Sequence, residues 1–175
     1  MKGCLAKRDG VVNIKIKTMR IGTGYDIHKL IPSTESDFKL AGISIPFSKR
    51  CVAHSDGDVA IHALIDALLG AAALGDIGTH FPDTDPTYKN ADSAELLAYC
   101  LPLLESNGNE IENVDITIIT EQPKLAPYIS AMRDRLAEIL KIDRGRISVK
   151  AKTNEGLDAV GRGEAIAAQA VVLVV

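Results

Sequence analysis

Three features that mark common classes of protein are scarce in this sequence: paired cysteines, long apolar runs and excess positive charge. Its three cysteines, Cys4, Cys51 and Cys100, lie far apart and form no C-x-x-C pair, so we interpret them as incidental thiols of a reduced compartment. No apolar run approaches the roughly 20 residues that span a bilayer. The first residues also lack the hydrophobic stretch of a secretory signal. We therefore predict a cytoplasmic protein without a membrane partner; a plastid location is less favoured.

Positive charge is not in excess, because 20 Lys and Arg residues stand against 23 Asp and Glu residues, for a formal net charge of -3. Proteins that bind nucleic acids normally carry a broad basic field. The charge balance therefore argues against a nucleic-acid partner, and any contact with phosphate must be local.

A single domain is expected, because 175 residues with 46% hydrophobic content can bury one sizeable core. Residues 1–18 carry several Lys and Arg side chains but little that could pack, so we predict an N-terminal extension on which function does not depend. The domain then covers residues 19–175, where neither an internal repeat nor a linker divides the chain.

Hydrophobic periodicity predicts a mixture of helices and strands. Helical patterns cover residues 59–74, 92–106 and 125–140, and strand patterns cover residues 114–120, 146–152 and 164–175. Ser55, followed by Asp58, resembles a capping box at the start of the first helix. The last strand is apolar on both faces, so one face still needs cover after helices pack on the other. We predict an α/β or α+β fold, one sheet backed by helices, in an oligomer.

Three residues are candidate metal ligands. Asp26 and His28 lie two positions apart in an extended segment, so their side chains point to the same side. His62 in the first predicted helix could add a third ligand, and two imidazoles with one carboxylate suit a zinc ion that keeps one position open for substrate. Each histidine alone is more often a structural residue. Asp66, one turn after His62, either orients its imidazole or pairs elsewhere.

Two further segments could bind an anionic, hydroxylated ligand. His54 and Ser55 precede the first predicted helix, where a side-chain donor, a hydroxyl and free backbone N–H groups suit a phosphate, although Ser55 could simply cap the helix. Residues 75–86 are rich in turn formers and could hold sugar-like hydroxyl groups through Asp76 and Asp83, or form a solvated loop. Glu155, just after a predicted strand, is a candidate ligand for a hard metal such as Mg²⁺.

The ordered combination of these segments is more specific than any one of them. Seven motifs closely resemble those of the 2-C-methyl-D-erythritol 2,4-cyclodiphosphate synthases: residues 24–28 (GYDIH), 53–58 (AHSDGD), 72–78 (AALGDIG), 81–86 (FPDTDP), 114–119 (VDITII), 123–124 (PK) and 161–164 (GRGE). The resemblance runs from about residue 19 to residue 175. It leaves only the predicted extension uncovered.

This resemblance implies a homotrimer of ferredoxin-like subunits with active sites at the subunit interfaces. It also implies a reaction of the non-mevalonate isoprenoid pathway, in which 4-diphosphocytidyl-2-C-methyl-D-erythritol 2-phosphate becomes 2-C-methyl-D-erythritol 2,4-cyclodiphosphate. An oxygen of the 2-phosphate attacks the β-phosphorus and expels CMP, and no protein nucleophile takes part. Catalysis then rests on positioning and charge neutralisation.

The resemblance also implies a role for each candidate residue. Zn²⁺, or another divalent transition metal, would be bound by Asp26, His28 and His62, and the 2-phosphate by His54 and Ser55. The methylerythritol would lie among Ile77, Phe81 and Asp83, the ribose against Asp76 and Gly78, and the cytosine on the backbone of Thr120, Pro123, Lys124, Leu125 and Ala126. The diphosphate would lie along Ala151, Lys152 and Thr153, with Mg²⁺ or Mn²⁺ held by Glu155. His54 and Thr153 would be the catalytic residues.

The sequence departs from the family pattern at two places. Asn154 follows Thr153 where the family commonly has a second threonine, although Asn can still donate a hydrogen bond. Residues 158–160 lack the aromatic side chain that often precedes the Gly-Arg turn. In relatives this region and the arginine, here Arg162, line a cavity on the trimer axis that can hold an isoprenoid diphosphate.

Two other functions use the same residues. A zinc-dependent phosphohydrolase would use the same ligands but activate a water molecule, and it would release an open monophosphate. A metal-dependent binding or assembly protein would close the metal site with a fourth protein ligand, and none is evident nearby in the sequence.

Overall fold

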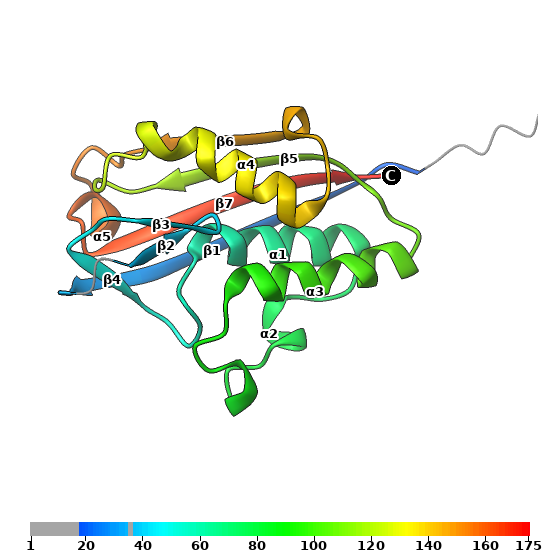
Figure 1. Cartoon of the computed structure of the whole chain (residues 1–175), viewed down its shortest axis with the longest axis horizontal. Coiled ribbons are helices and arrows are strands. Elements are labelled where there is room, and N and C mark those ends of the chain that lie inside the picture. The colour runs from blue at the N-terminus through cyan, green and yellow to red at the C-terminus, as the bar shows by residue number, and fades with distance from the viewer. Residues whose placement is uncertain (1–17, 35–36) are drawn as a thin grey trace, which may run out of the picture.

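A five-stranded mixed sheet forms the centre of the fold, and this confirms the prediction of one sheet backed by helices (Figure 1). The computed structural model describes residues 18–34 and 37–175, so the predicted extension lies outside the described residues except for its last one. The strand order is β4-β1-β7-β5-β6. These strands are β1 (Arg20–Pro32), β4 (Lys49–Val52), β5 (Ile111–Ile119), β6 (Ile147–Lys152) and β7 (Ala165–Val174). Strands β5 and β6 are parallel, and the other neighbouring pairs are antiparallel.

Three long helices cover one face of this sheet: α1 (Val59–Ala72), α3 (Ser93–Ser106) and α4 (Ile129–Leu140) (Figure 1). Helix α1 packs on β1 and β7, α3 packs beside α1, and α4 packs on β6. Nearly every residue of α1 is buried, as expected for a helix that is apolar on most sides. None of the helices in the described part of the chain is both long and apolar enough to cross a membrane.

Short elements connect the long ones, and the hydrophobic periodicity did not predict them. They are the hairpin β2 (Phe38–Leu40) and β3 (Ile43–Ile45), the one-turn helices α2 (Ile77–His80) and α5 (Asp158–Gly161), and the 3₁₀ turns η1 (Pro86–Tyr88), η2 (Ala126–Tyr128) and η3 (Arg144–Arg146). The helix predicted from residue 125 thus starts as a 3₁₀ turn, and α4 follows from Ile129.

The start of α1 corrects one prediction. The residue that caps this helix is Asp58, whose carboxylate accepts the N–H of Ile61 at 3.1 Å, and not Ser55. Asp58 is completely buried and also accepts the N–H groups of Ala41 at 2.8 Å and Gly42 at 2.7 Å. Asp58 therefore ties the β2–β3 hairpin to the start of α1. Ser55 is left free of the capping role.

The other face of β1 and β7 carries exposed apolar side chains. Ile21 is 70% exposed, Tyr25 57% and Ile27 45% on β1, and Val171 is 38% exposed on β7. The opposite residues of β1, from Gly22 to Leu30 at every second position, face α1. The chain covers this face at the start of β7, where Val160 of α5 packs against Ala165 and Ala167, but it leaves Ile21, Tyr25 and Val171 exposed.

Candidate metal centre and substrate pocket

Two glycines bring β1 close to α1. A Cβ atom at Gly22 would lie 1.8 Å from the carbonyl oxygen of Ala67, and one at Gly24 would lie 1.9 Å from that of Ala63. Only residues without a side chain fit at this contact. Because side chains alternate along a strand, Asp26 and His28 follow on the same side and reach α1 where His62 stands.

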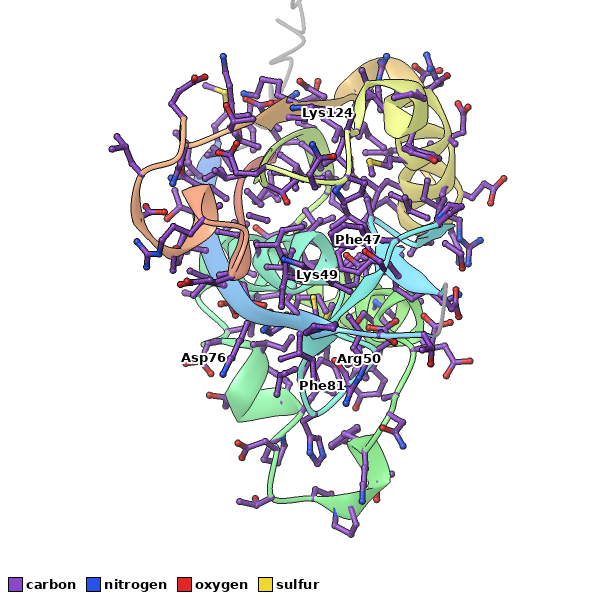
Figure 2. The ribbon with its side chains drawn as sticks, turned by 90° about the vertical axis from the view of Figure 1, so that its left-hand side faces the viewer. Phe47, Lys49, Arg50, Asp76, Phe81 and Lys124 are labelled. Carbon is purple, nitrogen blue, oxygen red and sulfur yellow. The ribbon has the colours of Figure 1, made fainter. Side chains whose placement is uncertain are left out.

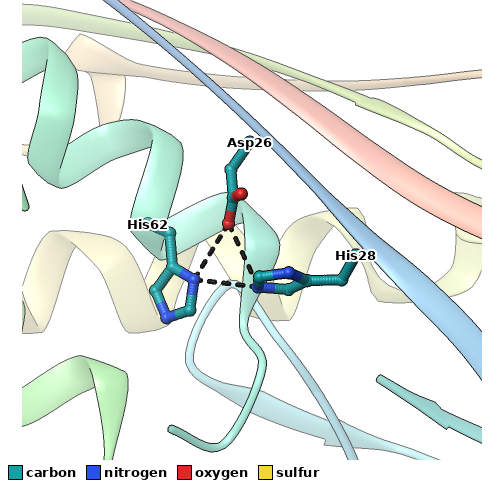
Figure 3. A group of neighbouring side chains, drawn as sticks. All are labelled: Asp26, His28 and His62. Atoms are coloured by element: carbon teal, nitrogen blue, oxygen red, sulfur yellow. Dashed lines mark hydrogen bonds and ion pairs between the residues drawn. The ribbon is translucent and has the colours of Figure 1, made fainter. Parts of the chain in front are cut away.

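The three predicted ligands converge on one point (Figure 3). Asp26 Oδ2 lies 2.9 Å from His62 Nδ1 and 3.1 Å from His28 Nε2, and the two ring nitrogens are 3.0 Å apart. Ligand atoms around a tetrahedral zinc ion are about 3.3 Å apart, given bonds of about 2.0–2.1 Å. The donor set and its spacing therefore fit one divalent metal ion. Within residues 18–34 and 37–175, these three side chains are the group that could hold a metal.

The electrostatics of this centre favour the metal-binding protonation states of Asp26 and His28, but favour a protonated ring at His62. Burial acts to raise the pKa of Asp26, but the hydrogen bond to His62 and the charges of both histidines outweigh it and keep the pKa below its usual range. Burial lowers the pKa of His28, and the charge of Asp26 offsets this only in part. Burial also acts to lower the pKa of His62, but its hydrogen bond to Asp26 and the Asp26 charge raise it overall. An ionised carboxylate and a neutral His28 imidazole are thus favoured before any metal binds.

A pocket of about 400 Å³ opens beside the triad. Its lining includes the three ligands and six other residues that the sequence had singled out, namely His54, Ser55, Ile77, Gly78, Phe81 and Asp83. The lining also includes Ala53, Asp66, Pro82, Tyr88 and Leu96, which the sequence had not assigned to substrate. The triad therefore faces a cavity that could admit a small molecule, and it is not sealed within the protein.

A second pocket of about 330 Å³ lies at the ends of β5 and β6. It is lined by nine further residues of the predicted site, Thr120, Pro123, Lys124, Leu125, Ala126, Ala151, Lys152, Thr153 and Glu155. No residue lines both pockets within the described part of the chain. In Figure 2, Lys124 lies in the upper part of the molecule, far above Asp76 and Phe81.

Two predicted site residues line neither pocket. Asp76 caps α2, because its carboxylate accepts both the N–H and the hydroxyl of Thr79 at 2.8 Å. Arg162 forms an exposed ion pair with Glu164 at 3.1 Å. The structure of one chain thus gives each of these two residues a local partner.

Comparison with known proteins assigns the chain to a family. A sequence model of the YgbB family matches residues 19–175. The chain belongs to the YgbB family. A relative from Clostridium perfringens, named 2-C-methyl-D-erythritol 2,4-cyclodiphosphate synthase, is 54% identical over 157 residues, which cover 90% of this chain and 99% of the relative. The resemblance predicted from the sequence motifs is confirmed, and the chain is an enzyme of the YgbB family.

Solved structures of the YgbB family agree with this fold. A 2C-methyl-D-erythritol-2,4-cyclodiphosphate synthase in a form bound to CDP is 40% identical with a TM-score of 0.82, and the match covers 89% of this chain and 100% of that one. A CDP complex of IspF from Plasmodium falciparum is 37% identical with a TM-score of 0.78, over 90% of this chain and 96% of that one. Both relatives were therefore solved with a cytidine nucleotide.

The structure also reveals residues of this YgbB-family site that the sequence reasoning missed. Asp66 does not orient His62; its carboxylate accepts the N–H of Ile77 at 2.8 Å and so holds the start of α2. The Nε2 atom of His62 instead faces the hydroxyl of Ser93, at the start of α3. At the second pocket, Glu121 accepts the N–H of Asn154 at 2.9 Å and so holds the turn that carries Glu155. Ser93 and Glu121 lie 31 and 33 positions from the residues that they contact, His62 and Asn154, and nothing in the sequence pattern joins them.

Proposed function

We propose that this chain converts 4-diphosphocytidyl-2-C-methyl-D-erythritol 2-phosphate to 2-C-methyl-D-erythritol 2,4-cyclodiphosphate and CMP at the pocket beside Asp26, His28 and His62. The observation that carries the proposal is the convergence of these ligands within about 3 Å of one another at the mouth of a pocket that also holds His54 and Ser55. The name of the Clostridium perfringens relative supports the same reaction.

The residues of the pocket suit a ring closure. An oxygen of the 2-phosphate forms a new bond to the β-phosphorus, the bond from that phosphorus to the CMP oxygen breaks, and CMP leaves with the electron pair. His54 and Ser55 donate hydrogen bonds to the attacking phosphate and hold it in line. The apolar wall that contains Ile77 and Phe81 limits access of water, so the intramolecular attack is favoured over hydrolysis.

We assign Zn²⁺, or a similar divalent transition metal, to the triad. Such an ion, when bound, polarises a phosphate oxygen and offsets its negative charge. The ligand set supports zinc, since two imidazoles and one carboxylate leave one tetrahedral position for a substrate oxygen.

The second pocket is assigned to the cytidine diphosphate part of the substrate. The backbone around Lys124 would receive the cytosine, and Thr153 would donate to the diphosphate as a second catalytic residue. Thr153 Oγ1 already lies 2.9 Å from Glu155 Oε1, which is the proposed ligand of Mg²⁺ or Mn²⁺. The CDP bound by the two relatives supports a cytidine nucleotide as part of the ligand.

We further propose a homotrimer of ferredoxin-like subunits, in a cytoplasmic setting. Two observations support assembly: the exposed apolar side chains of Ile21, Tyr25 and Val171 on the uncovered sheet face, and the separation of the two pockets within one chain. In a trimer the first pocket of one chain would meet the second pocket of its neighbour. Asp76 would contact the ribose across this interface, and Arg162 would lie near the trimer axis, where an isoprenoid diphosphate could bind.

Product analysis tests the proposed reaction. The purified full chain is incubated with the cytidyl substrate, with and without a chelator, and the products are identified by phosphorus NMR. We expect cyclic diphosphate and CMP, and we expect the chelator to stop their formation. An open monophosphate would instead indicate the phosphohydrolase, and no product at all, with a stoichiometric bound metal, would indicate a binding protein.

A further inference from the structure

The two ring nitrogens of His62 have different surroundings. Nδ1 faces the metal point, which is the place where the ligand atoms of Asp26, His28 and His62 converge. It lies 2.9 Å from Asp26 Oδ2 and 3.0 Å from His28 Nε2. Nε2 faces away from it, toward the hydroxyl groups of Ser93 at 2.8 Å and Ser55 at 3.0 Å. A neutral imidazole binds a metal through the nitrogen that carries no proton. His62 can therefore serve as a ligand through Nδ1 only when its proton is on Nε2.

The hydroxyl of Ser93 has one proton, which it donates in a hydrogen bond to Asp56. Ser93 Oγ donates a short hydrogen bond to Asp56 Oδ1, and the Ser93 N–H donates to Asp56 Oδ2 at 3.1 Å. A carboxylate without a proton can only accept. The Ser93 oxygen thus has only lone pairs left for His62, so Nε2 must be the donor in that contact.

The contact is rigid as well as directional. Ser93 is completely buried, and His62 is 8% exposed. Asp56 is held by the N–H of Asp58 at 3.1 Å, and its own N–H donates to the carbonyl of Ala91 at 3.1 Å. These bonds join the loop before α1 to the segment before α3, and so they fix the position of Asp56, which in turn holds the Ser93 hydroxyl that faces His62.

We infer that Ser93 and Asp56 are positioning residues that keep the proton of His62 on Nε2 and so present a bare Nδ1 to the divalent metal. Neither residue touches the metal point or lines the substrate pocket. Ser93 acts on His62 directly, and Asp56 acts through Ser93. The inference rests on the proposed metal site, and it adds two hydrogen-bonded residues behind the ligand His62.

Zinc affinity of the full chain tests this role. Apparent affinity for Zn²⁺ is measured by competition with a chromogenic chelator in the wild type, Ser93→Ala, Ser93→Val and Ser93→Thr. Loss of a hydrogen-bonding partner behind a metal ligand typically weakens binding by about 10- to 100-fold. We expect that loss in Ser93→Ala and Ser93→Val and its recovery in Ser93→Thr, which restores the hydroxyl at the same volume as valine. Asp56→Asn should also weaken zinc binding. Ser93 donates both its N–H and its hydroxyl proton to the Asp56 carboxylate, and the NH₂ group of an asparagine cannot accept either of them.

A matched variant separates this effect from nonspecific change. Ser106→Ala removes an exposed hydroxyl from the far end of the same helix and should leave zinc affinity unchanged. Equal zinc affinity in Ser93→Ala and the wild type would overturn the inference.

A spectroscopic measurement needs no variant. In zinc-loaded wild-type protein, nitrogen-15 NMR of the histidine rings should show His62 with a metal-shifted Nδ1 and a slowly exchanging proton on Nε2. Coordination through Nε2, or an Nε2 proton that exchanges freely with water, would overturn the inference. A wild-type chain that binds no zinc or forms no cyclic diphosphate would instead refute the proposed function itself.

Discussion

Gly24 on β1 lies directly against the carbonyl oxygen of Ala63 on α1, and a Cβ atom at Gly24 would stand 1.9 Å from that oxygen. The contact sets the distance between strand and helix just before Asp26. It therefore controls whether Asp26 and His28 on one element can share an ion with His62 on the other.

Replacing this glycine should damage both stability and metal binding. Gly24→Ala forces the strand and helix apart, and overpacking of this kind costs about 1–3 kcal/mol, occasionally more. Thermal unfolding and zinc content measure the two effects. Gly70→Ala is the matched control, because a Cβ atom there would lie an ordinary 3.9 Å from the carbonyl oxygen of Thr23, and alanine favours a helix. Equal behaviour of the two variants would contradict the close contact.

Removal of a metal ligand should stop turnover and leave the fold intact. We expect His62→Ala to lose zinc and to release CMP at least about 100-fold more slowly, the scale seen when a group that stabilises charge at a reacting centre is deleted. Circular dichroism should stay close to that of the wild type, because packing and not zinc supplies the core. His80→Ala, which removes a histidine that contacts the Leu74 carbonyl, should keep its zinc. A zinc-free His62→Ala variant with near-normal CMP release would contradict the mechanism.

Asp58 should contribute more to stability than an ordinary helix cap. Asp58→Ala leaves the N–H groups of Ala41, Gly42 and Ile61 without their acceptor in a buried place. Each unsatisfied buried group costs about 1–3 kcal/mol, so we expect a total loss of roughly 3 kcal/mol or more in urea unfolding. The exposed cap of α3, Asp92, accepts one N–H, and Asp92→Ala should cost only about 1 kcal/mol. Similar losses in both variants would contradict the role of Asp58 as a tie between hairpin and helix.

Two cysteines should be inert in the folded protein. Burial raises the pKa of Cys100 to about 12, and burial with nearby carboxylates raises the pKa of Cys51 to about 12. Because only the thiolate reacts, about one thiol in 10⁴ would be reactive at pH 8. Iodoacetamide at pH 8 should therefore modify neither residue until urea unfolds the chain, as peptide mass spectrometry can show. Rapid modification of Cys51 in the native protein would contradict its raised pKa.

The uncovered sheet face should be the assembly surface. Ile21→Glu puts a charge among exposed apolar side chains and should reduce the mass measured by light scattering from that of three chains to that of one. Activity should fall with it, because the two pockets would no longer meet. Arg135→Glu, on the exposed side of α4, should keep the mass of the wild type. An unchanged mass in Ile21→Glu would exclude this face as the interface.

The sequence by itself determined the local elements and the chemistry that each could carry. The alternation along β1 put Asp26 and His28 on one side, and the apolar run of α1 indicated a buried helix that displays His62. These are properties of neighbouring residues, so periodicity reveals them. The ordered motifs determined the family, because their combination is far more specific than any single one.

Only the tertiary structure decided how distant segments complete the site. Asp58 and not Ser55 caps α1, because three N–H groups from two separate elements converge on its buried carboxylate. Ser93 and not Asp66 orients His62, because α3 packs beside α1 and turns a buried hydroxyl toward the ring. Contacts of this kind depend on how helices dock on a sheet, and a pattern of adjacent residues carries no record of that docking.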